Sequence, residues 1–226
     1  MTKTIVKKKK LRIGRLLFLL LFVAVIGLFL YFLATTKIKN IIIKGNKLLS
    51  DEEIMKIAKI ETYPEFFLTW NNQIKERLEK NPLIESVSIK KDFHNTVKIK
   101  VKEQELLIKK EQTAKYITAK NEEVEYKKNL RVPTLKNEVP EKKFKSLIIN
   151  LKTVNKDILG QIAEIKYVPN EYDKDRFLLY MNDGNSVYLT LTKFEMINYY
   201  HKVLVQLEGK KGILYLDSGN HFKIME

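Results

Sequence analysis

The first feature of the hydrophobic pattern is a continuous apolar run near the N-terminus. Residues 16–36 contain no charged side chain. A bilayer hydrocarbon core about 30 Å thick needs roughly 20 apolar residues in a helix, so this run is long enough to span it. We therefore predict a transmembrane helix over residues 16–36. Its predicted membrane-anchor positions include Leu16, Phe22, Ile26, Leu30 and Ala34.

Beyond the apolar run, the pattern changes to short amphipathic segments. Residues 96–102 alternate strictly between apolar and polar side chains, which is typical of a strand with one buried and one solvated face. Residues 38–44 are rich in Ile and predict another strand. Ser50 and Glu53 have the spacing of a capping box and predict the start of a helix. With a second short helix and a strand around Val87, the predicted order over residues 37–105 is β-α-α-β-β.

Residues 106–226 mix both periodicities and predict a second α+β domain. Apolar positions at helical spacing predict helices over residues 144–154 and 194–207, the second opened by a capping box at Thr192 and Glu195. Strands are predicted on both sides of the Asp183-Gly184 hairpin turn. Residues 212–216 are predicted to form the final strand.

The aromatic loop between the two short helices has two interpretations. Phe66, Phe67 and Trp70 lie close together in the sequence, beside Pro64. Clustered aromatic side chains are more often part of a core than of a docking site, so we interpret all three as core.

Basic residues before the apolar run predict its orientation. Lysine and arginine are retained in the cytoplasm, which places residues 1–15 inside and the rest of the chain beyond the membrane. The residues predicted to set this topology are Lys7, Lys8, Lys9, Lys10, Arg12 and Arg15. A cleaved signal peptide is disfavoured because its apolar stretch spans about 7–15 residues. A nucleic-acid site in this basic run is disfavoured because such runs beside a membrane span contact anionic lipid.

Composition gives no indication of catalysis. The chain has no cysteine, and its three histidines lie far apart. No Gly-rich phosphate loop or recognisable nucleophile motif is present. Seven positive charges of the net +15 lie in residues 1–15. The remaining +8 is dispersed along the strands instead of forming the clustered footprint of a nucleic-acid protein. We therefore expect no enzyme activity, cofactor, metal, nucleic acid or small-molecule substrate.

Four segments carry a resemblance to a known family. They are residues 41–46, 49–54, 81–89 and 95–103. In this order they resemble a POTRA domain, and a POTRA domain directly behind one anchor resembles the FtsQ/DivIB family of bacterial cell-division proteins. His94 stands where that family usually has proline, and residues 60–64 replace a stretch that is often Gly-rich. Residues 106–226 then resemble the β domain of the family.

The resemblance implies a non-catalytic scaffold at the division septum. Such proteins recruit single-span partners of the FtsB/DivIC and FtsL types and act on septal peptidoglycan synthesis, which also makes a septal peptidoglycan synthase a candidate partner. In the family, the C-terminal strand of the β domain receives a partner strand by β-augmentation. Here the candidate partner-binding residues are Gly212, Ile213, Leu214, Tyr215, Leu216 and Tyr200.

Three alternatives stay open from the sequence. The strand over residues 212–216 could be ordinary core with a covered edge. The chain could instead be the POTRA module of an envelope secretion or membrane-protein assembly system, although residues 106–226 are too few for a typical outer-membrane barrel. An envelope enzyme would need clustered acids or a nucleophile, and none is visible.

Overall fold

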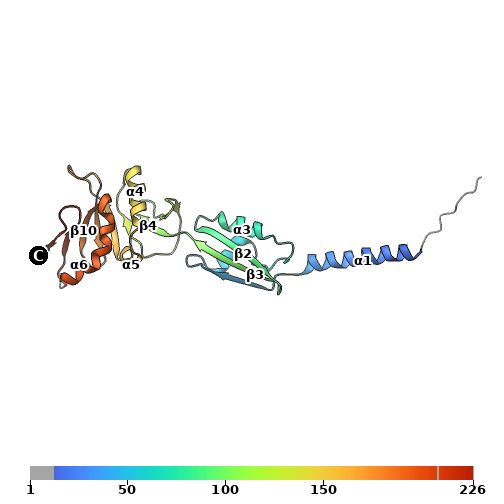
Figure 1. Cartoon of the computed structure of the whole chain (residues 1–226). Coiled ribbons are helices and arrows are strands. Elements are labelled where there is room, and N and C mark those ends of the chain that lie inside the picture. The colour runs from blue at the N-terminus through green and yellow to red at the C-terminus, as the bar shows by residue number, and fades with distance from the viewer. Residues whose placement is uncertain (1–12, 208, 226) are drawn as a thin grey trace, which may run out of the picture. The chain divides into compact units, whose positions relative to one another are not determined.

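The computed structural model describes residues 13–207 and 209–225 (Figure 1). The chain divides into two compact units, Met1–Glu103 and Gln104–Glu226. Each unit combines helices with a sheet, so the predicted α+β class is confirmed. We describe the two units separately.

The apolar run forms helix α1, Ile13–Thr35, and none of its side chains is buried by the protein. It is the one helix among the described residues that is long and apolar enough to cross a membrane. At 1.5 Å per residue, its length is about 35 Å. All five predicted anchor positions lie on α1, and Arg15 lies in its first turn. Lys7, Lys8, Lys9, Lys10 and Arg12 lie outside the described residues, so the orientation stays a prediction.

The rest of the first unit has the predicted β-α-α-β-β order. Its elements are β1 (Asn40–Lys44), α2 (Asp51–Ala58), α3 (Asn71–Glu79), β2 (Ile84–Asp92) and β3 (Thr96–Glu103). The sheet order is β1-β3-β2, with β1 parallel and β2 antiparallel to β3. Ile54 and Ala58 of α2 and Ile74 and Leu78 of α3 are buried with Val97, Ile99 and Val101 of β3. The alternation in β3 therefore predicted its buried face correctly.

The link between β1 and α2 is fixed by hydrogen bonds from both sides. Ser50 and Glu53 form the predicted capping box, with both reciprocal bonds present. The Glu103 carboxylate at the end of β3 accepts the backbone N–H groups of Lys47, Leu48 and Leu49 at 2.6, 2.7 and 2.9 Å. Hydrogen bonds to a charged acceptor are stronger than neutral ones, so this carboxylate holds the loop against the sheet.

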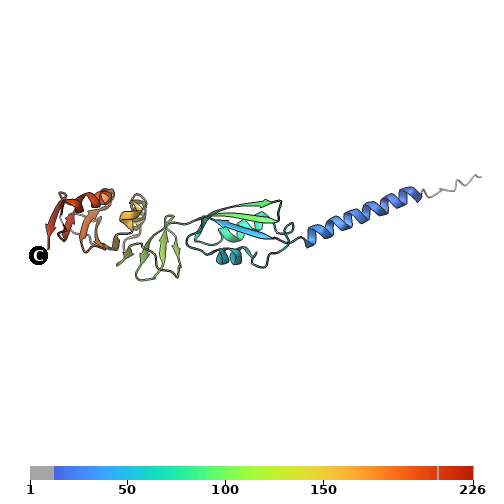
Figure 2. The ribbon, with the colours of Figure 1, turned by 90° about the horizontal axis from the view of Figure 1, so that it is seen from below.

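The second unit is built on one long mixed sheet. The sheet order is β12-β11-β10-β9-β8-β7-β4-β5-β6, and the β10–β11, β4–β7 and β7–β8 pairs are parallel. Its strands are β4 (Leu106–Lys110), β5 (Tyr116–Thr118), β6 (Glu123–Val124), β7 (Thr134–Leu135), β8 (Ile162–Tyr167), β9 (Arg176–Met181), β10 (Ser186–Thr190), β11 (Gly212–Tyr215) and β12 (His221–Ile224). Figure 2 shows this unit from below.

Four helical segments pack on this sheet and complete the hydrophobic core of the second unit. They are α4 (Glu141–Leu151), α5 (Lys156–Leu159), the 3₁₀ helix η1 (Leu191–Tyr199) and α6 (Tyr200–Gln206). Leu147 and Leu151 of α4 and Phe194 of η1 share one buried cluster with Phe177 and Leu189 of the sheet. The helices therefore cover one face of the sheet with a single apolar core.

The helix predicted over residues 194–207 differs from the observed one. Thr192 makes no capping bond, because the segment starts as a 3₁₀ helix whose first residue is Leu191. Lys193 inside it has non-helical angles, φ −119° and ψ 18°. The predicted capping box at Thr192 and Glu195 is therefore wrong, and α6 begins only at Tyr200.

Candidate interaction edge

The strand predicted to receive a partner is not at the edge of the sheet. β11 pairs in parallel with β10, where Ile213 lies opposite Ser186. On its other side it pairs with β12 in antiparallel register, where Gly212 lies opposite Ile224. The prediction that residues 212–216 form the final strand with an unpaired edge is therefore wrong. The covered-edge interpretation describes β11 correctly.

β12 was missed because it is short and follows a tight turn. The turn contains Gly219 at φ +83° and Asn220 at φ +50°, both in the left-handed region. A Gly-Asn pair between the apolar residues 213–216 and the alternating residues 221–224 is a hairpin signal. That signal, read from the sequence, would have predicted the additional strand.

The outer edge of β12 is the free edge at this end of the sheet. Among residues 13–207 and 209–225, no strand pairs with it. The Met225 N–H donates to the Lys211 carbonyl at 3.0 Å, so this pair is hydrogen-bonded towards β11. Bonded and non-bonded pairs alternate along an antiparallel ladder. The backbone N–H and C=O groups of Phe222 and Ile224 therefore point away from β11, in the geometry that an added strand needs.

Burial limits which of the predicted residues can contact a partner directly. Leu214, Leu216 and Tyr200 are buried, and so is Gly212. Direct contact through these side chains is excluded in this conformation, because the core of the second unit already encloses them. Ile213 and Tyr215 are half-buried, so partner contact through them stays a prediction. On β12, Ile224 is exposed.

Tyr200 instead positions β11 through a buried hydrogen-bond network. Its hydroxyl donates to the Asp183 carboxylate at 2.7 Å and accepts from the Asn185 amide at 3.0 Å. The Asn185 side-chain oxygen accepts the Gly212 N–H at 2.9 Å. Burial and the neighbouring Asp183 raise the pKa of Tyr200, so the hydroxyl stays protonated and keeps donating. The network joins the β9–β10 turn, α6 and the start of β11.

Replacing Tyr200 by phenylalanine is expected to destabilise the second unit by about 1 to 3 kcal/mol, because buried partners lose a hydrogen bond. Burial alone would raise the pKa of Asp183, but hydrogen bonds from Asn185 and Tyr200 outweigh it and lower the pKa. The free energy of unfolding that ionised Asp183 gains from these hydrogen bonds is fully present above the pKa of an unfolded aspartate, about 3.9. It is lost as the pH falls through the lower pKa that Asp183 has in the folded protein. Urea unfolding across this pH range should show the Tyr200→Phe deficit shrinking in acid. A deficit that is independent of pH would contradict the role of Asp183.

A row of stacked side chains crosses the sheet towards β12. The Arg176 guanidinium lies 3.7 Å from the centroid of the Tyr188 ring. Tyr188 stacks on Tyr215 at 5.3 Å, and Tyr215 stacks on the His221 ring at 4.7 Å with an interplanar angle of 8°. Arg176 also pairs with Asp217 at 2.6 Å. This row holds the β11–β12 hairpin in register with the interior strands.

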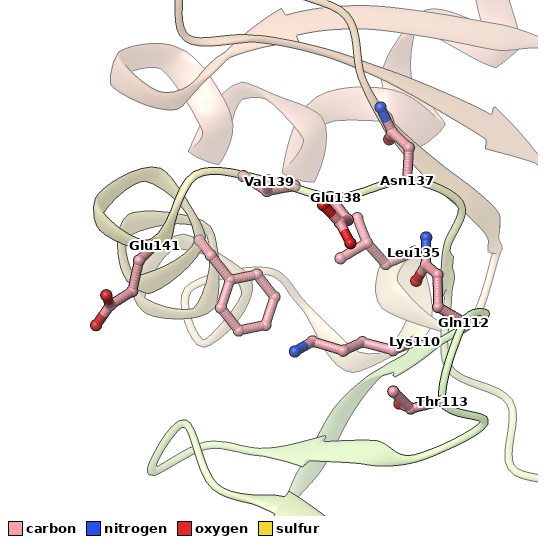
Figure 3. Close-up of a pocket in the computed structure, with 9 residues that line it drawn as sticks. Lys110, Gln112, Thr113, Leu135, Asn137, Glu138, Val139 and Glu141 are labelled. Carbon is pink, nitrogen blue, oxygen red and sulfur yellow. The ribbon is translucent and has the colours of Figure 1, made fainter.

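A separate hollow in the second unit has no catalytic arrangement. Figure 3 shows Lys110, Gln112, Leu135 and Glu138 lining it, and its volume is about 320 Å³. The Lys110 ammonium lies 4.8 Å from the centroid of the Phe144 ring and also pairs with Glu123. The lining residues include no histidine or cysteine, and no metal-binding cluster exists among the described residues. The interaction edge is therefore the better candidate site.

The chain is similar to known proteins over one domain and over most of its length. Residues 36–104 match the family described as POTRA domain, FtsQ-type. The chain is 28% identical to the cell division protein DivIB of Listeria monocytogenes, over 96% of this chain and 84% of that protein. It is 29% identical to DivIB of Bacillus anthracis, over 96% and 86%. A solved extracytoplasmic domain of DivIB from Geobacillus stearothermophilus is 21% identical, with a TM-score of 0.38, over 46% of this chain and 94% of that one.

The apolar helix and the domain behind it define a single-pass membrane protein that carries an FtsQ-type POTRA domain. Over 96% of its length the chain is also similar to the DivIB cell-division proteins, at 28% and 29% identity.

Proposed function

We propose that the chain is a scaffold of the division machinery that recruits other single-span division proteins of the FtsB/DivIC and FtsL types. Through them it acts on septal peptidoglycan synthesis. The proposal includes the predicted orientation, with residues 1–15 in the cytoplasm, a span over 16–36 and the domains 37–105 and 106–226 outside. It also includes concentration of the protein at the septum.

The outer edge of β12 carries this proposal. An edge strand presents unpaired N–H and C=O groups and is a template for another strand. Phe222 and Ile224 direct these groups outward, and the exposed Ile224 side chain offers apolar contact beside them. A partner strand added here satisfies both donors and both acceptors, and so extends the sheet by β-augmentation. The correction of the predicted edge thus moves the proposed site from β11 to β12.

Membrane anchoring strengthens such an interaction without new contacts. A partner with its own span is confined to the same layer as the second unit. Its effective concentration there is set by tether length, which raises the apparent affinity. A four-residue edge can therefore suffice, although it would form a weak interface in free solution.

Replacing Ile224 by proline tests the edge directly. Proline removes the outward-facing N–H of this residue and leaves the inward bonds of Lys223 and Met225 in place. We expect partner affinity to fall at least about tenfold, which corresponds to 1.4 kcal/mol. The measurement is co-purification and titration of the full-length chain with its FtsL-type and DivIC-type partners in nanodiscs.

Ile224→Val is the matched control, because it retains the N–H and most of the apolar surface. Septal fluorescence of a tagged chain gives the cellular readout, with loss expected for the proline variant only. Unchanged partner titration by Ile224→Pro would reject β12 as the site. Uniform membrane fluorescence of the wild-type chain would count against the division-scaffold proposal itself.

A further inference from the structure

Two loops of the first unit expose large apolar side chains. In the loop before α3, Phe67, Leu68 and Trp70 are 41%, 55% and 65% exposed, although Phe66 beside them is buried. In the β2–β3 turn, Phe93 is fully exposed. The interpretation of Phe67 and Trp70 as core is therefore wrong. We call Phe67, Leu68, Trp70 and Phe93 the apolar rim.

The apolar rim lies at the end of the sheet where α1 joins it. The Phe66 N–H donates to the Thr36 carbonyl at 2.7 Å, directly behind the last turn of α1. The Phe67 ring lies 6.0 Å from the ring of Phe32, which is within α1. The β2–β3 turn is at the same end, because Lys39 N–H donates to the Asn95 carbonyl at 2.9 Å. Both loops therefore adjoin the exit of the anchor helix.

The loop is held in this position by the protein itself. The Lys91 ammonium donates to the carbonyl oxygens of Phe66 and Thr69 and lies 4.6 Å from the centroid of the Phe66 ring. Thr69 also closes the loop by donating its hydroxyl to the Glu65 carbonyl at 2.8 Å. Phe66 and Thr69 point inward, so Phe67, Leu68 and Trp70 are presented outward by a fixed backbone.

The length of α1 determines the depth in the bilayer at which the apolar rim lies. A helix of about 35 Å is longer than a hydrocarbon core of about 30 Å, so its last turn reaches the headgroup layer. Phe67, in contact with Phe32 of α1, is then held at the boundary between headgroups and acyl chains. Trp and Tyr side chains are enriched at this depth, and the apolar rim includes Trp70. Lys37 and Lys39 flank the same exit and can contact lipid phosphates.

We propose that the apolar rim inserts into the interfacial layer of the leaflet from which α1 emerges, so that the POTRA domain is docked on the lipid as well as tethered to it. The occupant is the lipid bilayer, because the rim contacts a residue of the membrane helix itself. This inference rests on the anchor helix and is independent of the partner site on β12. It fixes the first unit against rotation about the short link at Lys37.

The chain contains one tryptophan, Trp70, which is a built-in reporter of this contact. Full-length protein is placed in nanodiscs of phosphatidylcholine, alone or mixed with phosphatidylglycerol, with and without brominated acyl chains. We expect brominated lipid to quench Trp70 emission and aqueous iodide to quench it poorly. Quenching by brominated lipid supports the proposal whether it occurs in both kinds of nanodisc or only in those with phosphatidylglycerol. Quenching only with phosphatidylglycerol would show that the lysines contribute to the contact by binding anionic headgroups.

Phe93→Ser and Leu68→Ser remove exposed rim side chains while retaining Trp70. Each is expected to reduce quenching by brominated lipid and to increase quenching by iodide. Tyr172→Ser is the matched control, since Tyr172 is 96% exposed but lies in the second unit. It should leave both signals unchanged.

Two results would overturn the lipid proposal. One is Trp70 emission that brominated lipid does not quench and that iodide quenches freely in the nanodisc. The other is Trp70 emission that brominated lipid does not quench and that is protected from iodide only when partner proteins are added. That result would assign the apolar rim to a protein contact.

Discussion

Replacing Gly212 by alanine is expected to displace β12 while both compact units stay folded. A Cβ at this position would lie 2.1 Å from the Lys223 carbonyl oxygen and 2.7 Å from the Phe222 ring. The first obstacle is backbone, so no side-chain rotation can relieve it. Because β12 has only four residues and pairs on one side, moving it away costs less than distorting β11, which is paired on both sides.

Hydrogen exchange of the β12 amides measures this displacement. In Gly212→Ala, the amides of residues 221–225 should lose protection, the β9 and β10 amides should keep it, and partner binding should be lost together with the edge. Gly160→Ala is the control in the same unit, because an added Cβ there would lie 3.4 Å from the Lys156 carbonyl oxygen, an ordinary contact distance, and Gly160 has φ −68°. Full protection of β12 in the Gly212 variant would show that the strand tolerates the methyl group.

Replacing Gly45 by alanine is expected to destabilise the first unit strongly, because backbone strain and a steric clash add up at this position. Gly45 has φ +92°, which costs a residue with a Cβ about 1–2 kcal/mol. The added Cβ would also lie 2.2 Å from the Val101 carbonyl oxygen in β3. Relief requires β1 and the loop held by Glu103 to move together, so we expect a loss beyond the conformational cost alone.

Gly184→Ala separates the two contributions. Gly184 has nearly the same angle, φ +90°, but no atom lies within 4 Å of the position of its Cβ. Urea unfolding, followed by exchange of amides in each unit, should show a small loss for Gly184→Ala and a larger one for Gly45→Ala. Equal losses would mean that the contact with Val101 relaxes freely and that backbone strain is the whole effect.

The first unit could be predicted from the sequence because its local signals agree with its burial. The alternation of Val97, Ile99 and Val101 sets which face of β3 is covered, and Ser50 with Glu53 forms the capping box that their spacing indicates. The same spacing at Thr192 failed, because capping depends on the backbone angles of the residues between, and Lys193 is not helical.

The candidate site was harder to predict, because it depends on a very short strand and on which way individual side chains face. Residues 212–216 were correctly expected to contain a strand, but edge position depends on a four-residue element that follows it. Tyr200 was expected to contact a partner, whereas its hydroxyl is hydrogen-bonded to Asp183 inside the second unit. Among Phe66, Phe67 and Trp70, residue type cannot distinguish a side chain facing the core from one facing a second apolar phase. That choice needs the path of the backbone.

The parallel pairing of β1 and β3 also determines how the first unit responds to mechanical load. The anchor enters at Asn40 and the chain leaves at Glu103, at opposite ends of two paired parallel strands. Tension between membrane and second unit would therefore pull β1 and β3 past each other along their axes. The ladder from Asn40 to Lys44 must then shear as a group instead of opening one pair at a time. A load carried along the chain would therefore be resisted by all five pairs of this ladder at once.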